Sequence, residues 1–343
     1  MSSRQPIPAE LRGRTFLTTD GLAAGLSPTR MRGRDLQRPF RGVRVDTVDA
    51  LTLRARCAAL QQILPPNARY CGITAALLLG IPLPERLELA RELHVAVPRP
   101  RRAPTGRGIR GHSVAASPAD VQVWHGLQLS SAARTWCELG AMLSVPDLVA
   151  AGDFLIHWQL PLTTATALVD AVTNYPGRRG LPALRAALLL LDERAESAQE
   201  SRLRVSLVRG GLRELVANLP ITTTDGFRYR ADIAFPTSNT IIEYQSGHHD
   251  SPGAFRSDMT RVSRLEADGW RVMQVNADDL RDQRELVARV RRVLARGGWW
   301  AQLRLAGAGT AATFGRERRE ECVARVLEKT FLASQCRNGQ IWG

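Results

Sequence analysis

The sequence predicts an α/β protein with more than one domain, and three observations carry this prediction. The chain has 343 residues, which is more than a single hydrophobic core usually holds. Its hydrophobic content of 44% is sufficient for ordinary packed cores. Short β-prone runs alternate with segments whose apolar residues recur at helical spacing, and this alternation is typical of α/β folds.

Composition argues against membrane and secreted classes. No apolar run approaches the roughly 20 residues of a membrane span. The first residues lack the apolar region of a signal peptide. The five cysteines form no CxxC pair and no metal-type cluster, so reduced thiols are expected. We therefore expect a cytoplasmic protein with no membrane partner.

Positive charge is concentrated in the first third of the chain. The formal net charge is +14, and residues 1–112 hold 19 arginines against 8 acidic residues, a net of +11. A basic region of this kind attracts phosphate backbones. A general preference for arginine is the competing interpretation, but it does not explain why acids fail to balance arginine in this third alone. We therefore expect DNA to be a partner.

Residues 1–50 predict a small winged helix-turn-helix. A helix over residues 20–25 is followed by a tight turn, Ser27 and Pro28 begin a second helix, and a strand follows over residues 40–45. The second helix carries three arginines expected to contact DNA, namely Arg30, Arg32 and Arg34. A capping subdomain with solvated arginines is the alternative interpretation.

Residues 51–192 predict an α+β region that continues into helices. Helices are expected over residues 51–64, 73–79, 130–143, 145–158, 163–175 and 181–191, and strands over 93–97, 109–114 and 121–124. The stretch PRPRRAPTGRGIR holds five arginines and no acid, and its Pro and Gly residues predict a loop. Arg101 and Arg102 in this loop either contact phosphates or only keep a mobile loop soluble.

Residues 193–298 predict a separate mixed sheet. The expected order is a helix over 197–209, a strand near 221–224, a hairpin over 229–245, a helix over 254–268, a strand over 270–275 and a helix over 280–296. The last strand follows a helical crossover, so it should pair parallel with its neighbour. Residues 299–343 do not continue this pattern and are expected to be a loosely attached or disordered tail.

The hairpin carries two acidic residues that its turn should bring together. Residues 236–239 form a four-residue turn, so that Phe235 pairs with Thr240 and Asp232 lies opposite Glu243. Opposed Cβ atoms are roughly 5 Å apart. Two ionised carboxylates that close repel each other, and a divalent cation would turn the repulsion into a binding site. Two solvated acids on an exposed sheet face are the alternative.

Four stretches between residues 193 and 296, two of which contain the acids, are AESAQESRLR, RADIAFP, IIEYQSGHH and DMTRVSRLEADGWRVMQVNADDL. Together they resemble the very-short-patch-repair-like (Vsr-like) endonuclease domain of the PD-(D/E)XK superfamily. The resemblance implies a restriction-endonuclease-like core, in which a mixed sheet is flanked by helices. Earlier in the chain, LHVAVP and SSAARTW resemble the N-terminal region of AbiEi-type antitoxins.

The resemblance implies hydrolysis of phosphodiester bonds with Mg²⁺ or Mn²⁺. Asp232 and Glu243 would hold the metal, and Glu200 matches a position where relatives place a further acid. Glu200 is explained equally well by a capping box with Ser197.

Gln245 departs from the motif, which places a lysine there. Glutamine can orient a water or a phosphate oxygen, but it neither carries charge nor accepts a proton as a base. His248 or His249 would then be the proton acceptor or a phosphate contact, because neutral imidazole accepts a proton near pH 7. Two polar loop residues without a role are the alternative.

Two functions follow from these observations. The first is a DNA-binding protein with a metal-dependent, endonuclease-like domain. The second is a non-catalytic DNA-binding transcriptional regulator or antitoxin with a degenerate nuclease fold, working with a toxin or a defence-system partner. The corresponding domain boundaries are 1–50, 51–192, 193–298 and 299–343.

Overall fold

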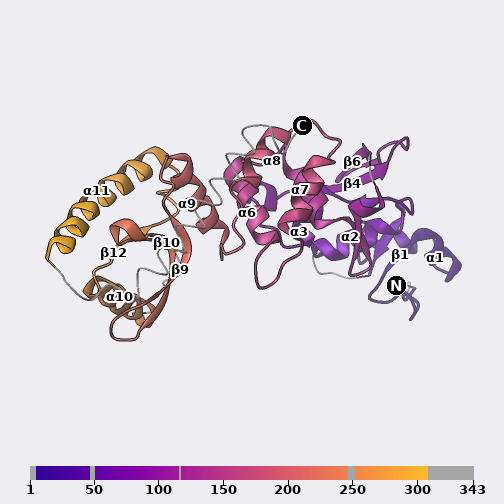
Figure 1. Cartoon of the computed structure of the whole chain (residues 1–343). Coiled ribbons are helices and arrows are strands. Elements are labelled where there is room, and N and C mark those ends of the chain that lie inside the picture. The colour runs from indigo at the N-terminus through magenta and orange to yellow at the C-terminus, as the bar shows by residue number, and fades with distance from the viewer. Residues whose placement is uncertain (1–4, 47–50, 116, 246–251, 308–343) are drawn as a thin grey trace. The chain divides into compact units, whose positions relative to one another are not determined.

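The computed structural model describes residues 5–46, 51–115, 117–245 and 252–307. It is a mixed α/β structure that divides into two compact units (Figure 1). The first unit comprises the described residues up to Met142 together with Ala167–Leu181, and the second comprises Leu143–Thr166 and the described residues from Pro182 onward. The division differs from the predicted boundary at residue 192, because residues 143–166 belong with the C-terminal unit. No helix of the described residues is long and apolar enough to span a membrane.

The first unit contains a two-stranded and a six-stranded sheet. The small sheet pairs β1 and β2 antiparallel, and the large one has the order β5-β6-β4-β3-β8-β7. Buried side chains of β4 pack against α2 and α3 in one apolar cluster. The elements are β1 (Thr15–Leu17), α1 (Thr18–Ala23), η1 (Arg30–Arg32), β2 (Val43–Val45), α2 (Leu53–Gln61), β3 (Arg69–Tyr70), α3 (Gly72–Leu78), α4 (Glu85–Glu88), β4 (Leu93–Pro98), β5 (Thr105–Gly106), β6 (Ile109–Val114), η2 (Pro118–Asp120), β7 (Val121–Trp124), β8 (Leu127–Ser130), α5 (Ala132–Leu139) and α7 (Ala165–Thr173).

The predicted second helix of the helix-turn-helix is wrong. Only the single 3₁₀ turn η1 forms after Pro28, and the chain leaves helical geometry at Gly33 with a ψ of 146°. A Cβ on Gly33 would lie 2.5 Å from Asp35 Oδ1, so glycine allows Asp35 to fold back on Arg30. The ion pair between these two side chains replaces the continued helix.

The second unit is built on a four-stranded sheet of order β12-β11-β10-β9. The hairpin strands are central, and β11 pairs parallel with β12, which confirms the predicted topology. The elements are α6 (Val145–Leu155), α8 (Leu181–Leu188), α9 (Ala198–Arg209), β9 (Val216–Thr222), β10 (Arg228–Phe235), η3 (Pro236–Ser238), β11 (Thr240–Tyr244), α10 (Pro252–Ala267), β12 (Arg271–Val275) and α11 (Gln283–Gly307).

Two boundaries in this unit differ from the prediction. Strand β9 begins at Val216, five residues earlier than expected. Helix α11 continues through Gly297 and Gly298 to Gly307, so the predicted tail does not begin at residue 299. Residues 308–343 lie outside the described residues.

The sheet of the second unit packs apolar side chains on both faces. Ile233, Phe235 and Ile242 contact the buried residues of α9 and α11, as their alternation predicts. Ile241 belongs to a second cluster with Leu265 of α10. Figure 1 shows α10 on the opposite side of the sheet from α9 and α11. The acidic hairpin is therefore held between two helical layers.

A buried ion pair joins α6 to α9 and explains why residues 143–166 belong to this unit. Asp153 Oδ2 accepts hydrogen bonds of 2.7 Å from both Arg204 Nη2 and Ser201 Oγ. Its Oδ1 accepts one from the backbone N–H of Asp192, also at 2.7 Å. The Asp153 side chain is 1% exposed and that of Arg204 is 7% exposed. A pair buried this deeply is costly to break on one side only.

We predict that Asp153→Ala lowers the free energy of unfolding by about 3–5 kcal/mol, because it leaves a buried guanidinium without its partner. Urea unfolding followed by circular dichroism measures this change. The control is Asp278→Ala, which removes a pair whose side chains are 78% and 80% exposed. The control should shift stability by no more than about 1 kcal/mol. Equal effects of the two variants would contradict the assignment.

Candidate functional site

The turn of the hairpin sets the cross-strand register. Pro236–Ser238 form the 3₁₀ turn η3, and Asn239 closes it in the left-handed conformation with a φ of 46°. Asparagine tolerates that conformation better than most residues. Phe235 is then the partner of Thr240, and Ile233 is the partner of Ile242. The predicted register is confirmed from Phe235 with Thr240 to Ile233 with Ile242, where the paired ladder of these two strands ends, one position before Asp232 and Glu243.

The side chain of Asp232 connects the two hairpin strands just past the last paired residues, Ile233 and Ile242. Its Oδ2 accepts a 2.8 Å hydrogen bond from the backbone N–H of Tyr244. The faces of β10 change at this residue, because Ile233 packs toward α9 and α11 whereas Ala231 packs with the α10 cluster. On the neighbouring strand, Asn218 lies opposite Asp232 and has a φ of 51°. The local distortion of both strands places Asp232 at a bend in the sheet.

Glu243 is buried on the α10 side of the sheet. It is 4% exposed, and its Oε2 accepts a hydrogen bond from the Tyr229 hydroxyl. The same oxygen lies 4.0 Å from Nη2 of Arg261. Its other oxygen, Oε1, is buried and has no hydrogen-bond partner among the described residues. An unsatisfied buried carboxylate oxygen is unusual and requires an explanation.

Burial perturbs the pKa values of both acids, and the charge of Glu243 adds to the effect at Asp232. Loss of solvent, followed by the charge of Glu243, raises the pKa of Asp232 to about 7. Loss of solvent likewise raises the pKa of Glu243, although the Tyr229 hydroxyl and Arg261 oppose that shift. The pair therefore gains a proton more readily than exposed carboxyls do, or requires a cation to remain ionised.

Glu200 belongs to the helix cap and also acts on Asp232. Its backbone N–H donates to Ser197 Oγ at 3.1 Å, and its carboxylate accepts from Asn218 Nδ2 at 3.2 Å. Burial raises the pKa of Glu200 despite these hydrogen bonds, and its charge contributes to the raised pKa of Asp232. Ser197 thus caps the helix as predicted, but the Glu200 carboxylate accepts from the backbone N–H of Glu196 at 3.1 Å, so the reciprocal half of the capping box does not form with Ser197.

Gln245 lies close to α10 at the end of β11. Its Nε2 donates a 3.2 Å hydrogen bond to Asp258 Oδ2, which also accepts from Gln274 Nε2 at 3.1 Å. His248 and His249 lie outside the described residues. Within the ranges that the structure describes, no group of three or more His, Cys, Asp or Glu side chains is placed to hold a metal ion.

Arg30 is buried, which contradicts its predicted role as a DNA contact. It is 8% exposed, and its two terminal nitrogens donate to the two carboxylate oxygens of Asp35 at 3.1 and 2.7 Å. A guanidinium forked onto an internal carboxylate holds the loop together and is not presented to a phosphate. We reassign Arg30 to a structural role.

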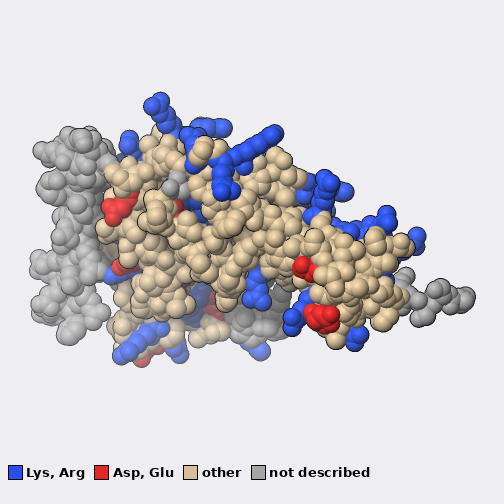
Figure 2. Space-filling view, turned by 90° about the vertical axis from the view of Figure 1, so that its right-hand side faces the viewer, with Lys and Arg blue, Asp and Glu red and all other residues tan. Residues whose placement is uncertain are grey.

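The other predicted DNA contacts are exposed. They are Arg32, Arg34, Arg101 and Arg102. Figure 2 shows a face of the molecule from which basic side chains project in many places and acidic ones in few.

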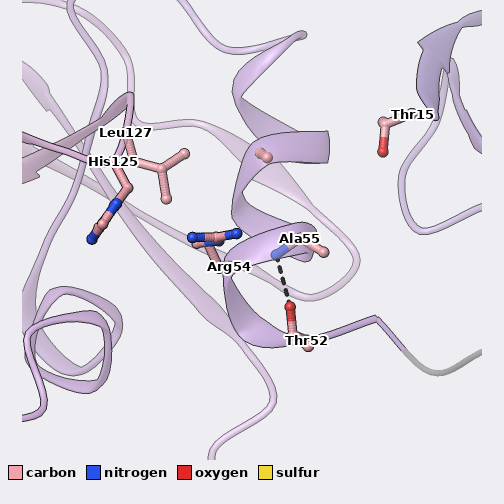
Figure 3. A pocket seen from close by; sticks show the side chains of 7 residues that line it. Thr15, Thr52, Arg54, Ala55, His125 and Leu127 are labelled. Carbon is pink, nitrogen blue, oxygen red and sulfur yellow. Dashed lines mark hydrogen bonds between the residues drawn. The ribbon is translucent and has the colours of Figure 1, made fainter.

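A groove of about 640 Å³ opens in the first unit (Figure 3). Arg54 at the start of α2 and His125 in the β7–β8 turn lie on its walls, together with Thr15, Thr52 and Leu127. None of the lining residues is acidic. Sequence reasoning missed this groove, because its walls come from three segments that carry no shared motif.

Sequence reasoning also missed that Tyr229 and Arg261 both approach Glu243. Tyr229 lies four residues before Ile233 on β10, so strict alternation would place it on the same face as Ile233, toward α9 and α11. The change of face at Asp232 places it instead on the α10 side, where it contacts Glu243. The spacing of Asp258 and Arg261 predicts an ion pair, and the structure shows that pair, with side chains only 15% and 28% exposed. No local sequence signal indicates that Arg261 also reaches Glu243.

Comparison with known proteins finds two similar chains, both from Mycobacterium tuberculosis. They are the uncharacterized protein MT2308 of strain CDC 1551 / Oshkosh and the uncharacterized protein Rv2248 of strain ATCC 25618 / H37Rv. Each is 31% identical over 246 residues, which cover 71% of this chain and 88% of the relative. No family model and no solved structure matches the chain.

We predict that Asp232→Asn removes a pH-dependent loss of stability. The folded pKa of about 7 lies above the ordinary value of 3.8, so the stabilising contribution of the proton is complete below about pH 4 and is lost as pH rises through 7. In a chelator, the variant should exceed the wild type by on the order of 2 kcal/mol at about pH 8 and match it near pH 4. Urea unfolding across this range, with the exposed Glu266→Gln as control, measures the difference. A difference independent of pH would contradict the assignment.

Proposed function

The chain belongs to one family with the two mycobacterial proteins, and from its own residues we propose that it is a DNA-binding protein whose C-terminal unit hydrolyses phosphodiester bonds with Mg²⁺ or Mn²⁺. We further propose that the sheet of this unit is a Vsr-like PD-(D/E)XK core. The observation that carries the proposal is the buried pair Asp232 and Glu243, with one carboxylate oxygen unsatisfied. Strongly perturbed acids with a specific charge partner are typical of functional sites.

The residues present fit a divalent cation. Asp232 and Glu243 supply carboxylate oxygens, and Glu243 Oε1 is a buried acceptor that lacks a donor. A cation would supply the missing charge and keep both acids ionised despite their burial. Magnesium commonly uses only one or two protein carboxylates and keeps several waters, so a third protein ligand is not required. Glu200 is near enough to Asp232 to add charge to the site.

The surrounding residues have positioning roles in this proposal. When bound, the metal would lower the pKa of a coordinated water and stabilise charge on the phosphate. The Tyr244 N–H orients Asp232, and the Tyr229 hydroxyl orients Glu243. Asp258 holds the Gln245 amide, which can hydrogen-bond a water or a phosphate oxygen but cannot take up a proton. His248 or His249 would be the proton acceptor.

The exposed arginines of the first unit support DNA binding. Arg32, Arg34, Arg101 and Arg102 are exposed, and Arg54 adds positive charge to a groove that no acidic residue lines. Residues 99–110 carry five arginines that are all exposed. Contacts of this kind bind the phosphate backbone regardless of sequence.

A non-catalytic regulator or antitoxin is the second candidate, with a toxin or defence-system protein as its partner. Two observations favour it. Gln245 cannot act as a base, and Arg261 already places a positive charge 4.0 Å from Glu243. In this alternative, the arginine permanently takes the place of the metal, and the fold only binds DNA.

We predict that the full chain binds Mn²⁺ in calorimetry and nicks supercoiled plasmid when Mn²⁺ or Mg²⁺ is added. Asp232→Asn and Glu243→Gln each remove a carboxylate charge, so both should weaken metal binding by on the order of 10- to 100-fold and abolish nicking. Glu266→Gln, an exposed neutralisation on α10, is the control and should leave both unchanged. Equal nicking by all four proteins would point to a contaminant. Metal binding without nicking would favour the regulator.

A separate prediction concerns the DNA contacts. The double substitution Arg101→Ala with Arg102→Ala should weaken binding to a DNA duplex of about 25 base pairs. The slope of log K against log salt concentration should become shallower by about one unit per arginine. Arg30→Ala should instead lower thermal stability, because it removes a buried guanidinium and its ion pair with the half-buried Asp35. Filter binding at several salt concentrations measures the slopes. A reduced salt slope for Arg30→Ala, together with an unchanged slope for the double variant, would reverse the assignment of Arg30 to structure and of Arg101 and Arg102 to DNA contact.

A further inference from the structure

Three buried atoms of the acid site lack a hydrogen-bond partner among the described residues. Glu243 Oε1 and Asp258 Oδ1 are acceptors, and Arg261 Nε is a donor. Asp258 Oδ1 already has an ion pair with Arg261 Nη2, which leaves Glu243 Oε1 and Arg261 Nε. They belong to side chains that already face each other, since Arg261 Nη2 lies 4.0 Å from Glu243 Oε2. A ligand that satisfied both would present a hydrogen-bond donor or a cation to the carboxylate and an acceptor to the guanidinium. A metal ion with a bound phosphate oxygen has both features.

Arg261 is positioned by three contacts. It forms an ion pair with Asp258 on the same helix, and its guanidinium lies over the Tyr229 ring at 5.0 Å from the centroid. The hydroxyl of that same ring donates to Glu243. Arg261 is 28% exposed at its side chain, so it borders the solvent, whereas Glu243 is 5% exposed. The Arg261 side chain is therefore the more solvent-accessible of the two.

We propose that Arg261 is the internal counter-ion of Glu243, which a divalent cation displaces, and that the displaced guanidinium then binds a phosphodiester oxygen of the substrate. The inference rests on the proposed function and adds a substrate-binding residue to it. A guanidinium keeps its charge at any working pH, so it neutralises Glu243 only by proximity and not by proton transfer. Two cations beside one carboxylate repel, which drives Arg261 away when a metal binds. Its fork of donors matches a phosphate.

Arg264 provides a matched control one turn further along α10. Its guanidinium lies over the Phe227 ring at the same 5.0 Å from the centroid. It pairs with Asp225 at 3.7 Å, and its side chain is 47% exposed. Both arginines thus stack on an aromatic ring, Tyr229 in β10 or Phe227 just before that strand, and pair with a carboxylate. They differ in that Arg261 also faces Glu243.

The first experiment measures metal affinity without activity. Calorimetric titration of the full chain with Mn²⁺ compares the wild type with Arg261→Gln and Arg264→Gln. Arg261→Gln should bind Mn²⁺ more tightly, by on the order of tenfold, because a competing positive charge is removed. Arg264→Gln should bind with the wild-type affinity. Unchanged or weaker binding by Arg261→Gln overturns the proposal, as does an equal gain by Arg264→Gln.

The second experiment measures binding to a short DNA duplex with Ca²⁺ and with EDTA. Ca²⁺ should strengthen binding by the wild type, because it frees Arg261 for a phosphate. Arg261→Gln should lose this Ca²⁺-dependent gain, with a salt slope lower by about one. In EDTA, Arg261→Gln should bind as the wild type does, and Arg264→Gln should keep the gain. A full Ca²⁺-dependent gain in Arg261→Gln overturns the proposal.

Arg261→Lys separates the effect of the charge from that of the guanidinium geometry. It also replaces Arg261→Gln if thermal unfolding shows that the glutamine variant does not fold. The lysine variant keeps the charge, so its Mn²⁺ affinity should stay within about twofold of wild type, while the loss of the fork should reduce the Ca²⁺-dependent gain. Equal behaviour of Arg261→Lys and Arg264→Lys in the duplex assay overturns the proposal. A wild-type chain that binds no Mn²⁺ removes the proposed function as well. A wild-type chain that binds Mn²⁺ with no change in Arg261→Gln removes this inference alone.

Discussion

The cross-strand register of β10 and β11 is the constraint on which the acid site depends. The turn closed by Asn239 pairs Phe235 with Thr240, and the later pairs follow from this one. A slip of one residue would turn Glu243 toward the apolar layer of α9 and α11 and would move Ile242 to the α10 side of the sheet. Because that slip would bury a carboxylate among aliphatic side chains and disrupt the packing of both layers, the hydrophobic core holds Glu243 in position.

Loss of water then determines the chemistry of the site. Burial is the largest cause of the raised pKa values of both Asp232 and Glu243, and a neighbouring carboxylate adds to each, Glu243 for Asp232 and Asp258 for Glu243. A buried charge that lacks a full set of partners costs folding stability. Arg261 and the Tyr229 hydroxyl offset part of that cost but leave Glu243 Oε1 unsatisfied. The arrangement is understandable if the site serves a ligand and not the stability of the fold.

Helix α9 connects the site to the rest of its unit. Its first turn carries Glu200, its apolar face packs Leu203 and Leu207 against the sheet, and Arg204 forms the buried pair with Asp153 of α6. The chain therefore enters this unit for the first time through residues 143–166, before the sheet begins. The placement of the third acid relative to the hairpin thus depends on an ion pair that is remote in sequence.

The sequence by itself determined the acidic hairpin, its register, the parallel last strand and the central helices, because local periodicity and turn residues govern each of these. It could not determine that Arg30 folds onto Asp35 and ends a helix early, since charge patterns do not reveal which carboxylate an arginine meets. It also could not place Tyr229 and Arg261 at Glu243. Their convergence depends on the bend at Asp232 and Asn218 and on the packing of α10, which arise only when segments distant along the chain come together.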